Sequence, residues 1–188
     1  MSDKSGSLYV IRHGRTEWNL IKKLQGQTDI PLDDEGIRMA RKAHDLYMDV
    51  NFDRCFCSPL IRARQTAQLL LEGRDIPIEY DDRLKEINFG EYEGLEYMNL
   101  PEGHPVRSAF FDPAGYTPSG GGETITDVMG RTRDFLNEKV YPLLAKGCDV
   151  LVVGHGLMNS TIILNALKLP VSKLWDEGIE NCVLKKLI

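Results

Sequence analysis

Two histidines of this chain each follow a short apolar run and each precede a glycine. His13 comes after residues 7–12, and His155 comes after residues 149–154. Short apolar runs of this kind are typical of buried strands, so both rings would lie at strand ends. The glycine that follows lets a substrate come close to the backbone. One such histidine would most simply cap backbone groups, whereas two strand-end His-Gly pairs favour a reaction centre.

Two other segments carry charged side chains that suit work on a phosphate. Residues 58–67, SPLIRARQTA, should begin a helix because Pro59 fits the first helical position. Arg62 then falls in the first turn, where free N–H groups and the positive end of the helix dipole attract anions. Glu86 opens the glycine-punctuated segment 86–94 and could serve as a proton donor. Together with the two histidines, these residues predict a phosphate site that contains an acid.

Strand-like and helix-like patterns alternate along the chain, which predicts an α/β fold. Strands are expected at residues 7–12, 52–57, 76–80, 149–154 and 181–188. Helices are expected at 33–50, 59–71, 124–145 and 156–169, and Pro142 should bend or shorten the third. The expected architecture is a three-layer α/β/α sandwich with a mostly parallel central sheet. Ligands of such sheets bind outside the carboxyl ends of the strands, where both histidines fall.

The chain shows no internal repeat and no domain boundary. We therefore expect residues 1–188 to form a single domain with one full hydrophobic core. Residues 95–122 are expected to form an irregular excursion over the active site, since 101–122 alone hold four prolines and five glycines. One short helix is expected there, around Val106–Phe111.

Composition argues against several classes of partner. The net charge is −5 and the isoelectric point is about 5.4, so a basic face for nucleic acid is not expected. No apolar run approaches the ~20 residues that span a bilayer, and the N-terminus lacks the apolar core of a signal peptide. The sequence thus predicts a cytoplasmic protein with no membrane partner, and it leaves the oligomeric state open. The four cysteines match no zinc framework, and Cys55 and Cys57 should be small buried hydrophobes on one strand face.

Four motifs follow one another in a fixed order. They are RHG-x-T-x-x-N at 12–19, SPLIRARQTA at 58–67, E-x-x-x-G-x-x-E-G at 86–94 and V-x-H-G at 153–156. In this order they resemble the histidine phosphatase superfamily, whose fold is phosphoglycerate mutase-like. The resemblance runs from about Leu8 to the last strand, and residues 24–36, LQGQTDIPLDDEG, resemble the pattern after the family's first motif.

The resemblance implies a role for each matching residue. His13 would accept the phosphoryl group, and Glu86 would protonate the leaving oxygen and then deprotonate the attacking water. Cationic groups would surround the equatorial oxygens: Arg12, Arg62 and His155. Further substrate contacts would come from Thr16, Asn19, Gln25, Gly26 and Gly156. Preset cations stabilise the charge that phosphoryl transfer spreads over these oxygens, so neither a metal nor another cofactor is expected. The arginines would also favour a neutral, nucleophilic His13, whereas His155 would be most useful when protonated.

Three functions compete for this chain. A metal-independent phosphatase that acts through a phosphohistidine on a small phosphorylated metabolite is favoured. A phosphoglycerate mutase that depends on 2,3-bisphosphoglycerate is the first alternative. The excursion 95–122 holds one arginine, Arg107, and no lysine, and segment 86–94 lacks the mutase-type E-R-H-Y-G run. A non-catalytic phosphate-binding module is the second alternative, and the full set of candidate catalytic residues argues against it.

The substrate stays open among broad phosphomonoesters, phosphoglycerate, sugar phosphates and the α-ribazole phosphate of cobalamin synthesis. Aromatic residues in and near the excursion could build a partly aromatic mouth, although local packing would explain them as well. These residues are Tyr92, Tyr97, Phe110, Phe111 and Tyr116.

Overall fold

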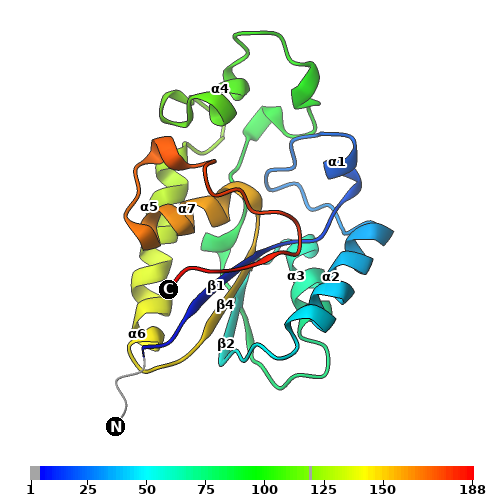
Figure 1. Cartoon of the computed structure of the whole chain (residues 1–188). Coiled ribbons are helices and arrows are strands. Elements are labelled where there is room, and N and C mark those ends of the chain that lie inside the picture. The colour runs from blue at the N-terminus through cyan, green and yellow to red at the C-terminus, as the bar shows by residue number, and fades with distance from the viewer. Residues whose placement is uncertain (1–4, 119) are drawn as a thin grey trace.

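A computed structural model of the chain describes residues 5–118 and 120–188. Its centre is a five-stranded sheet in the order β3-β2-β4-β1-β5 (Figure 1). The strands are β1 (Leu8–Arg12), β2 (Arg54–Cys57), β3 (Ile78–Tyr80), β4 (Val150–Gly154) and β5 (Leu184–Lys186). The first four run parallel to one another, and β5 pairs with β1 in the antiparallel direction. The predicted mostly parallel sheet is confirmed.

Helices cover both faces of the sheet, as Figure 1 shows. One face carries α2 (Asp34–Tyr47) and α3 (Ile61–Leu70), and the other carries α5 (Ile125–Phe135), α6 (Tyr141–Leu144) and α7 (Gly156–Leu167). Successive strand residues point to opposite faces. Val10 of β1 accordingly joins the cluster under α5 and α7, whereas Ile11 joins the cluster under α2 and α3. The three-layer α/β/α sandwich is thereby confirmed.

Local chemistry explains several element boundaries. Asp33 caps α2, because its carboxylate accepts a hydrogen bond from the Gly36 N–H at 2.7 Å. The helix expected over 124–145, which Pro142 should bend or shorten, is interrupted before Pro142 by a π-helical turn, Leu136–Val140, between α5 and α6. Cys55 and Cys57 lie in one buried cluster, as expected, and burial raises the pKa of the Cys55 thiol to about 12.

Three boundaries differ from the predictions. Helix α3 begins at Ile61 rather than at Pro59, with Leu60 as its extended N-cap residue. A four-residue helix that the patterns did not predict, α1 (Glu17–Leu20), follows the first histidine motif. The last strand spans three residues instead of eight, since Cys182 adopts a left-handed φ of 58° that interrupts extended backbone.

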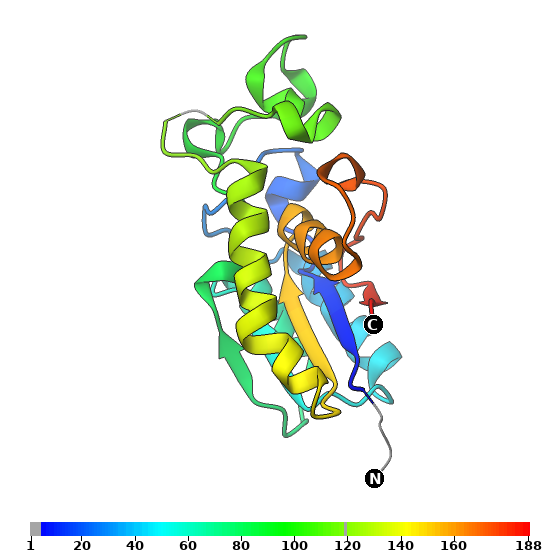
Figure 2. The ribbon, with the colours of Figure 1, turned by 90° about the vertical axis from the view of Figure 1, so that its left-hand side faces the viewer.

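The excursion at residues 95–122 arches beyond the carboxyl ends of the parallel strands (Figures 1 and 2). It contains α4 (Pro105–Phe111), as predicted, and two single turns of 3₁₀-helix at Tyr97–Asn99 and Pro113–Gly115. None of the helices in the described ranges combines the length and the apolar character needed to cross a membrane.

Candidate active site

The two strand-end histidines meet because β1 and β4 are neighbours in register. Arg12 pairs with Gly154 in the ladder, so His13 and His155 leave the sheet at the same level. The backbone N–H of His13 donates to the Gly154 carbonyl at 2.9 Å, and the centroids of the two imidazole rings lie 5.2 Å apart. Both side chains are buried. The expected convergence of two His-Gly strand ends is therefore observed.

The ring of His13 is oriented by its own neighbour. Its Nδ1 lies 2.7 Å from the Gly14 carbonyl oxygen, so Nδ1 carries the proton and Nε2 keeps its lone pair. The Gly14 N–H donates to Thr66 Oγ1 at 3.0 Å, which ties this turn to α3. A side chain at Gly14 would bring a Cβ to 2.5 Å from the Gly36 carbonyl oxygen, so this position requires glycine.

Two arginines reach the site with part of their guanidinium groups unpaired. Arg62 is fully buried in the first turn of α3, and it donates to the Thr28 carbonyl at 2.9 Å and to the Gly26 carbonyl at 2.7 Å. Arg12 donates to the Ile179 carbonyl at 3.3 Å. Within the described residues, the buried Nε atoms of both arginines have no hydrogen-bond partner. Buried donors seek an acceptor, and an anion would supply one.

His155 is held by a serine that sequence reasoning did not single out as a functional residue. Its Nε2 lies 2.7 Å from Ser58 Oγ, and Ser58 is kept in place where the chain turns from β2 toward α3. Among the described residues nothing pairs with the buried Nδ1 of His155. Nδ1 is therefore the ring atom that is left for a ligand.

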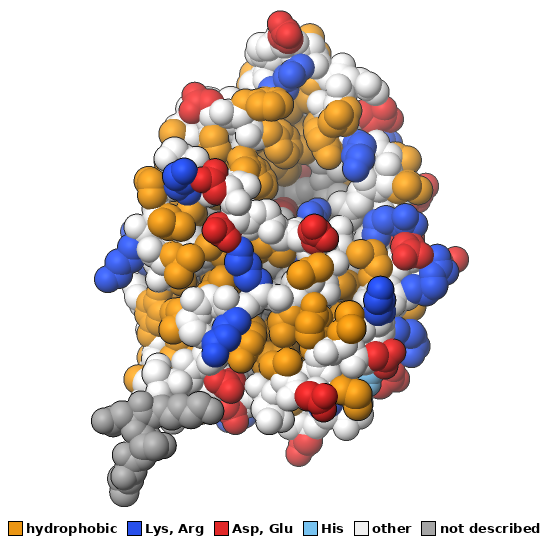
Figure 3. All heavy atoms as spheres, in the orientation of Figure 1, with side chains coloured by type: hydrophobic (Ala, Val, Ile, Leu, Met, Phe, Trp, Pro, Cys, Tyr) orange, Lys and Arg blue, Asp and Glu red, His pale blue; other side chains and the backbone are white. Residues whose placement is uncertain are grey.

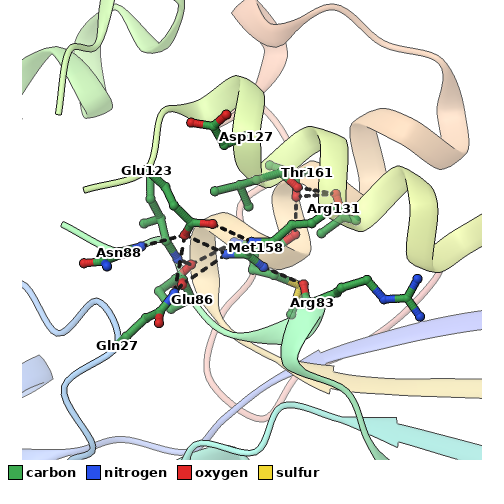
Figure 4. A network of polar contacts seen from close by, with 12 residues as sticks. Gln27, Arg83, Glu86, Asn88, Glu123, Asp127, Arg131, Met158 and Thr161 are labelled. Atoms are coloured by element: carbon green, nitrogen blue, oxygen red, sulfur yellow. Dashed lines mark hydrogen bonds and ion pairs between the residues drawn. The ribbon is translucent and has the colours of Figure 1, made fainter. Parts of the chain in front are cut away.

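Glu86 faces the start of α7. Its carboxylate accepts the backbone N–H groups of Leu157 at 3.2 Å and Met158 at 2.9 Å, where the positive end of the helix dipole favours negative charge. Figure 4 shows the polar network that fixes the backbone of Glu86 from the other side. Gln27 and Arg131 each donate to the Glu86 carbonyl at 3.1 Å. Neither of these two residues was a sequence candidate.

A second acid completes that network. Glu123 forms an ion pair with Arg131 at 2.8 Å and accepts the Asn88 N–H at 2.9 Å (Figure 4). Thr124, which follows it, caps α5 in a reciprocal pair with Asp127. Residues 120–124 thus form a turn and a helix cap, and Glu123 in addition braces the backbone around Glu86.

A cavity of about 210 Å³ beneath the excursion joins Arg12, His13, Arg62 and Glu86. The fully buried His155 is not among the described residues that line it. Figure 3 shows the surface hollowed there, with apolar side chains gathered above the hollow. Its lining includes the predicted residues Arg12, His13, Gln25, Gly26, Arg62, Glu86 and Gly156. The rest of the lining is formed by Lys23, Leu24, Phe89, Tyr97, Phe110, Leu157 and Trp175.

An aromatic stack walls one side of this cavity. Phe110 lies between Tyr97, at 5.2 Å between ring centroids, and Trp175, at 5.7 Å. Trp175 is fixed by its indole N–H, which donates to the Ala109 carbonyl at 2.9 Å. Tyr97 and Phe110 confirm part of the predicted aromatic mouth. Trp175 comes from a C-terminal loop that carries no recognisable motif. Its contribution to the cavity wall is therefore apparent only from the three-dimensional structure.

Two predicted substrate-binding residues are engaged elsewhere. Asn19 Oδ1 accepts hydrogen bonds from the backbone N–H and the hydroxyl of Thr16, both at 3.1 Å. Thr16 in turn caps α1 through the Asn19 N–H. In the parts of the chain that are described, neither residue belongs to the lining of the cavity. A direct role for them in holding phosphate stays a prediction, because the helix cap engages the Thr16 hydroxyl and Asn19 Oδ1 but does not use the Asn19 side-chain NH₂ group.

The charge states of the two histidines follow from burial. Burial first, and the nearby positive charges of Arg62 and Arg12 next, lower the pKa of His13 well below its ordinary value of 6.5. The pKa of His155 is lowered in the same direction, chiefly by burial and by Arg62. His13 is thus neutral and able to attack at neutral pH. An anion bound beside His155 would favour the protonated form of its ring.

This lowered pKa predicts the acidic side of the pH profile. We expect kcat/KM for phosphate release to keep its plateau as the pH falls through 6.5, and to decline only well below that value, where His13 becomes protonated. Initial rates should be measured on aryl phosphates whose second phosphate pKa differs. A decline that moves with this pKa belongs to the substrate, and a decline that stays in place belongs to the enzyme. In Arg62→Gln one lowering cause is absent, so the enzyme's limb should move to higher pH. A wild-type enzyme limb at or above 6.5 would contradict the assignment.

Metal-ligating side chains do not cluster here. Over residues 5–118 and 120–188, no group of three or more His, Cys, Asp or Glu side chains is arranged to hold a metal ion.

Comparison with known proteins agrees with this geometry. The family model of the histidine phosphatase superfamily (branch 1) matches residues 8–188. A 2,3-bisphosphoglycerate-dependent phosphoglycerate mutase 2 of Gloeobacter violaceus is 34% identical over 94% of this chain and 82% of its own. An adenosylcobalamin/alpha-ribazole phosphatase of Salmonella typhimurium is 32% identical over 93% of this chain and 86% of its own.

Solved structures give the same result. A mutant phosphoserine phosphatase of Entamoeba histolytica, in complex with phosphoserine, superposes with a TM-score of 0.84 and 28% identity. The match covers 97% of this chain and 90% of that one. The family model over 8–188 and the curated relatives above 30% identity are decisive. This chain belongs to the histidine phosphatase superfamily.

Proposed function

We propose that this protein is a phosphomonoester hydrolase that works through a phosphohistidine on His13. One observation carries the proposal. A neutral imidazole with a free Nε2 stands beside two arginines whose buried Nε atoms have no partner within the described residues, in a cavity that Glu86 also lines. Such a set supplies a nucleophile, charge stabilisation and an acid in one place.

The chemistry proceeds in two balanced steps. His13 Nε2 attacks phosphorus and forms an N–P bond while the P–O bond to the leaving group breaks. The leaving oxygen takes a proton from Glu86 and departs as an alcohol. A water molecule then attacks the phosphorus, Glu86 accepts its proton, and the N–P bond breaks to release inorganic phosphate. The charge on the equatorial oxygens is met by Arg12, Arg62 and His155 in both steps.

The cavity favours hydrolysis over mutase chemistry. A mutase has to hold a bisphosphorylated species, so a second anionic group needs cations of its own. Away from the phosphate-binding groups, Lys23 is the one cation among otherwise apolar and aromatic lining residues of the described chain. Arg107 of the excursion donates to the Leu100 carbonyl at 3.0 Å and lies over the Phe111 ring. It therefore does not supply the missing charge.

We also propose that residues 1–188 act as one domain in the cytoplasm, on a small phosphorylated metabolite. The sheet is shared by both hydrophobic clusters, which supports one domain. All four cysteines are free thiols, and free thiols persist in a reducing compartment. The cavity of about 210 Å³ suits a small substrate.

A paired assay tests hydrolysis against phosphoryl transfer between positions. With excess EDTA, we expect steady phosphate release from p-nitrophenyl phosphate and from small alkyl phosphates. With 3-phosphoglycerate and a trace of 2,3-bisphosphoglycerate, we expect phosphate release or no reaction, rather than 2-phosphoglycerate. Conversion to 2-phosphoglycerate faster than phosphate release would replace the proposal with the mutase. Binding of inorganic phosphate without any turnover would indicate a non-catalytic module.

A further inference from the structure

The buried guanidinium of Arg62 is held by one loop of four residues. Its Nη2 donates to the Gly26 carbonyl at 2.7 Å, and its Nη1 donates to the Thr28 carbonyl at 2.9 Å. Both acceptors belong to residues 25–28, and the first two residues of that loop also line the cavity. The direction in which Arg62 presents its free Nε therefore depends on where this loop sits.

The loop itself is wrapped around a single carboxylate, that of Glu93. One oxygen, Oε1, accepts the Gln27 N–H at 2.8 Å and the Phe89 N–H at 3.2 Å. The other, Oε2, accepts the Thr28 N–H at 2.9 Å and the Thr28 hydroxyl at 2.5 Å. Four donors converge on one partly buried anion, and the charge of the acceptor strengthens these bonds.

The backbone at Gly26 is shaped to admit that carboxylate. Gly26 has a left-handed φ of +51°, and a Cβ there would lie 2.0 Å from Glu93 Oε1. Any other residue would expel the carboxylate or strain the turn. Loop 25–28 thus links the two charged residues. Its carbonyl groups accept from Arg62, and its amide groups donate to Glu93.

We infer that Glu93 is a positioning residue of the phosphate site: by anchoring loop 25–28, it sets the orientation in which Arg62 meets the phosphate. The inference rests on the proposed function, in which Arg62 binds the phosphoryl oxygens. A secondary electrostatic effect acts in the same direction. Burial lowers the pKa of Arg62 to about 10, and the negative charges of Glu86, Asp29 and Glu93 oppose that fall, so Arg62 stays charged.

The variant Glu93→Gln tests this role with little change in size. The amide keeps one acceptor oxygen but turns an NH₂ group toward backbone N–H donors, so at least one backbone bond is lost and the negative charge that strengthens the others is removed. We expect kcat/KM for p-nitrophenyl phosphate to fall about 10- to 100-fold, as for loss of hydrogen bonds to a charged group. The dissociation constant of inorganic phosphate, measured by calorimetry, should rise by a similar factor. Glu91→Gln, two residues away on the same segment, is the matched control and should change neither value.

A double-mutant cycle with Arg62 separates positioning from a general loss of folding. In an Arg62→Ala background, Glu93→Gln should lower kcat/KM by less than about threefold, because the group it positions is gone. An equal loss in both backgrounds, or an unchanged phosphate affinity in the single variant, would overturn the inference. If Glu93→Gln fails to fold, Thr28→Val removes only the hydroxyl donor and should show a smaller loss with the same dependence on Arg62.

The calorimetric measurement keeps the two proposals distinct. Absence of turnover in the wild type would refute the proposed hydrolase, yet the effect of Glu93→Gln on phosphate affinity would still decide the positioning role. Normal turnover with an unaffected Glu93→Gln would refute only the positioning role.

Discussion

Replacing His13 with alanine is expected to remove phosphate release, with a loss in kcat of at least ~10⁴-fold for p-nitrophenyl phosphate in excess EDTA. The expectation follows from the ring's position. His13 Nδ1 is committed to the Gly14 carbonyl at 2.7 Å, which leaves the lone pair of Nε2 free to attack within the cavity that His13 lines. Without it, the arginines bind phosphate but no N–P bond can form. The variant should therefore still bind inorganic phosphate.

His44→Ala serves as the matched histidine control. His44 lies in α2, with its Nδ1 3.0 Å from the Leu70 carbonyl oxygen, and it does not line the described cavity. Its removal should leave kcat unchanged. Rapid quenching should also trap an acid-labile phosphoenzyme in the wild type and none in His13→Ala. Substantial turnover by a folded His13→Ala would show that another group is the nucleophile.

Replacing Glu86 with glutamine should have an effect that depends on the leaving group. For alkyl phosphates the leaving oxygen needs a proton, so we expect a loss in kcat of about 10²- to 10⁴-fold. For p-nitrophenyl phosphate the leaving group is stable as an anion, and the loss should be much smaller. Steady-state rates on both substrates, measured with the same preparations, give the comparison. Equal losses on the two substrates would count against the acid role.

The structural contacts of Glu86 make stability an essential control in this experiment. Its carboxylate accepts the N–H groups of Leu157 and Met158 at the start of α7, so a change there can weaken the helix. Glutamine retains one oxygen for these donors. Thermal unfolding of wild type and variant shows whether the fold is weakened. A loss of fold would lower the rates on both substrates together, whereas a loss of acid chemistry would lower chiefly the rate on alkyl phosphates.

The residues of the candidate site could be predicted from the sequence, whereas most of the residues that hold them in place could not. Strand-end position and motif order placed His13, His155, Arg62 and Glu86, and the structure brings these four together. This part was predictable because strand ends and helix starts are set by local pattern. The parallel sheet then carries local positions to one edge of the fold.

The supporting contacts could not be predicted because they join segments far apart in the chain. Ser58 meets His155 across 97 residues, and Gln27 meets the backbone of Glu86 across 59. No periodicity encodes such pairs. Trp175 enters the cavity wall from a loop without a motif, for the same reason. Thr16 and Asn19, by contrast, belong to a motif, but capping of α1 engages the Thr16 hydroxyl and Asn19 Oδ1.

The pairing of β1 with β4 also governs when the site can come into existence. These neighbours are distant along the chain: Ser7, just before β1, bonds to Asp149, just before β4, across 142 residues. Closing so long a loop costs conformational entropy, so we expect this pairing to form late in folding. A nascent chain that ends before β4 contains His13 but neither His155 nor the start of α7, whose N–H groups bind Glu86. The candidate site can therefore assemble only after β4 has been synthesised and has paired with β1.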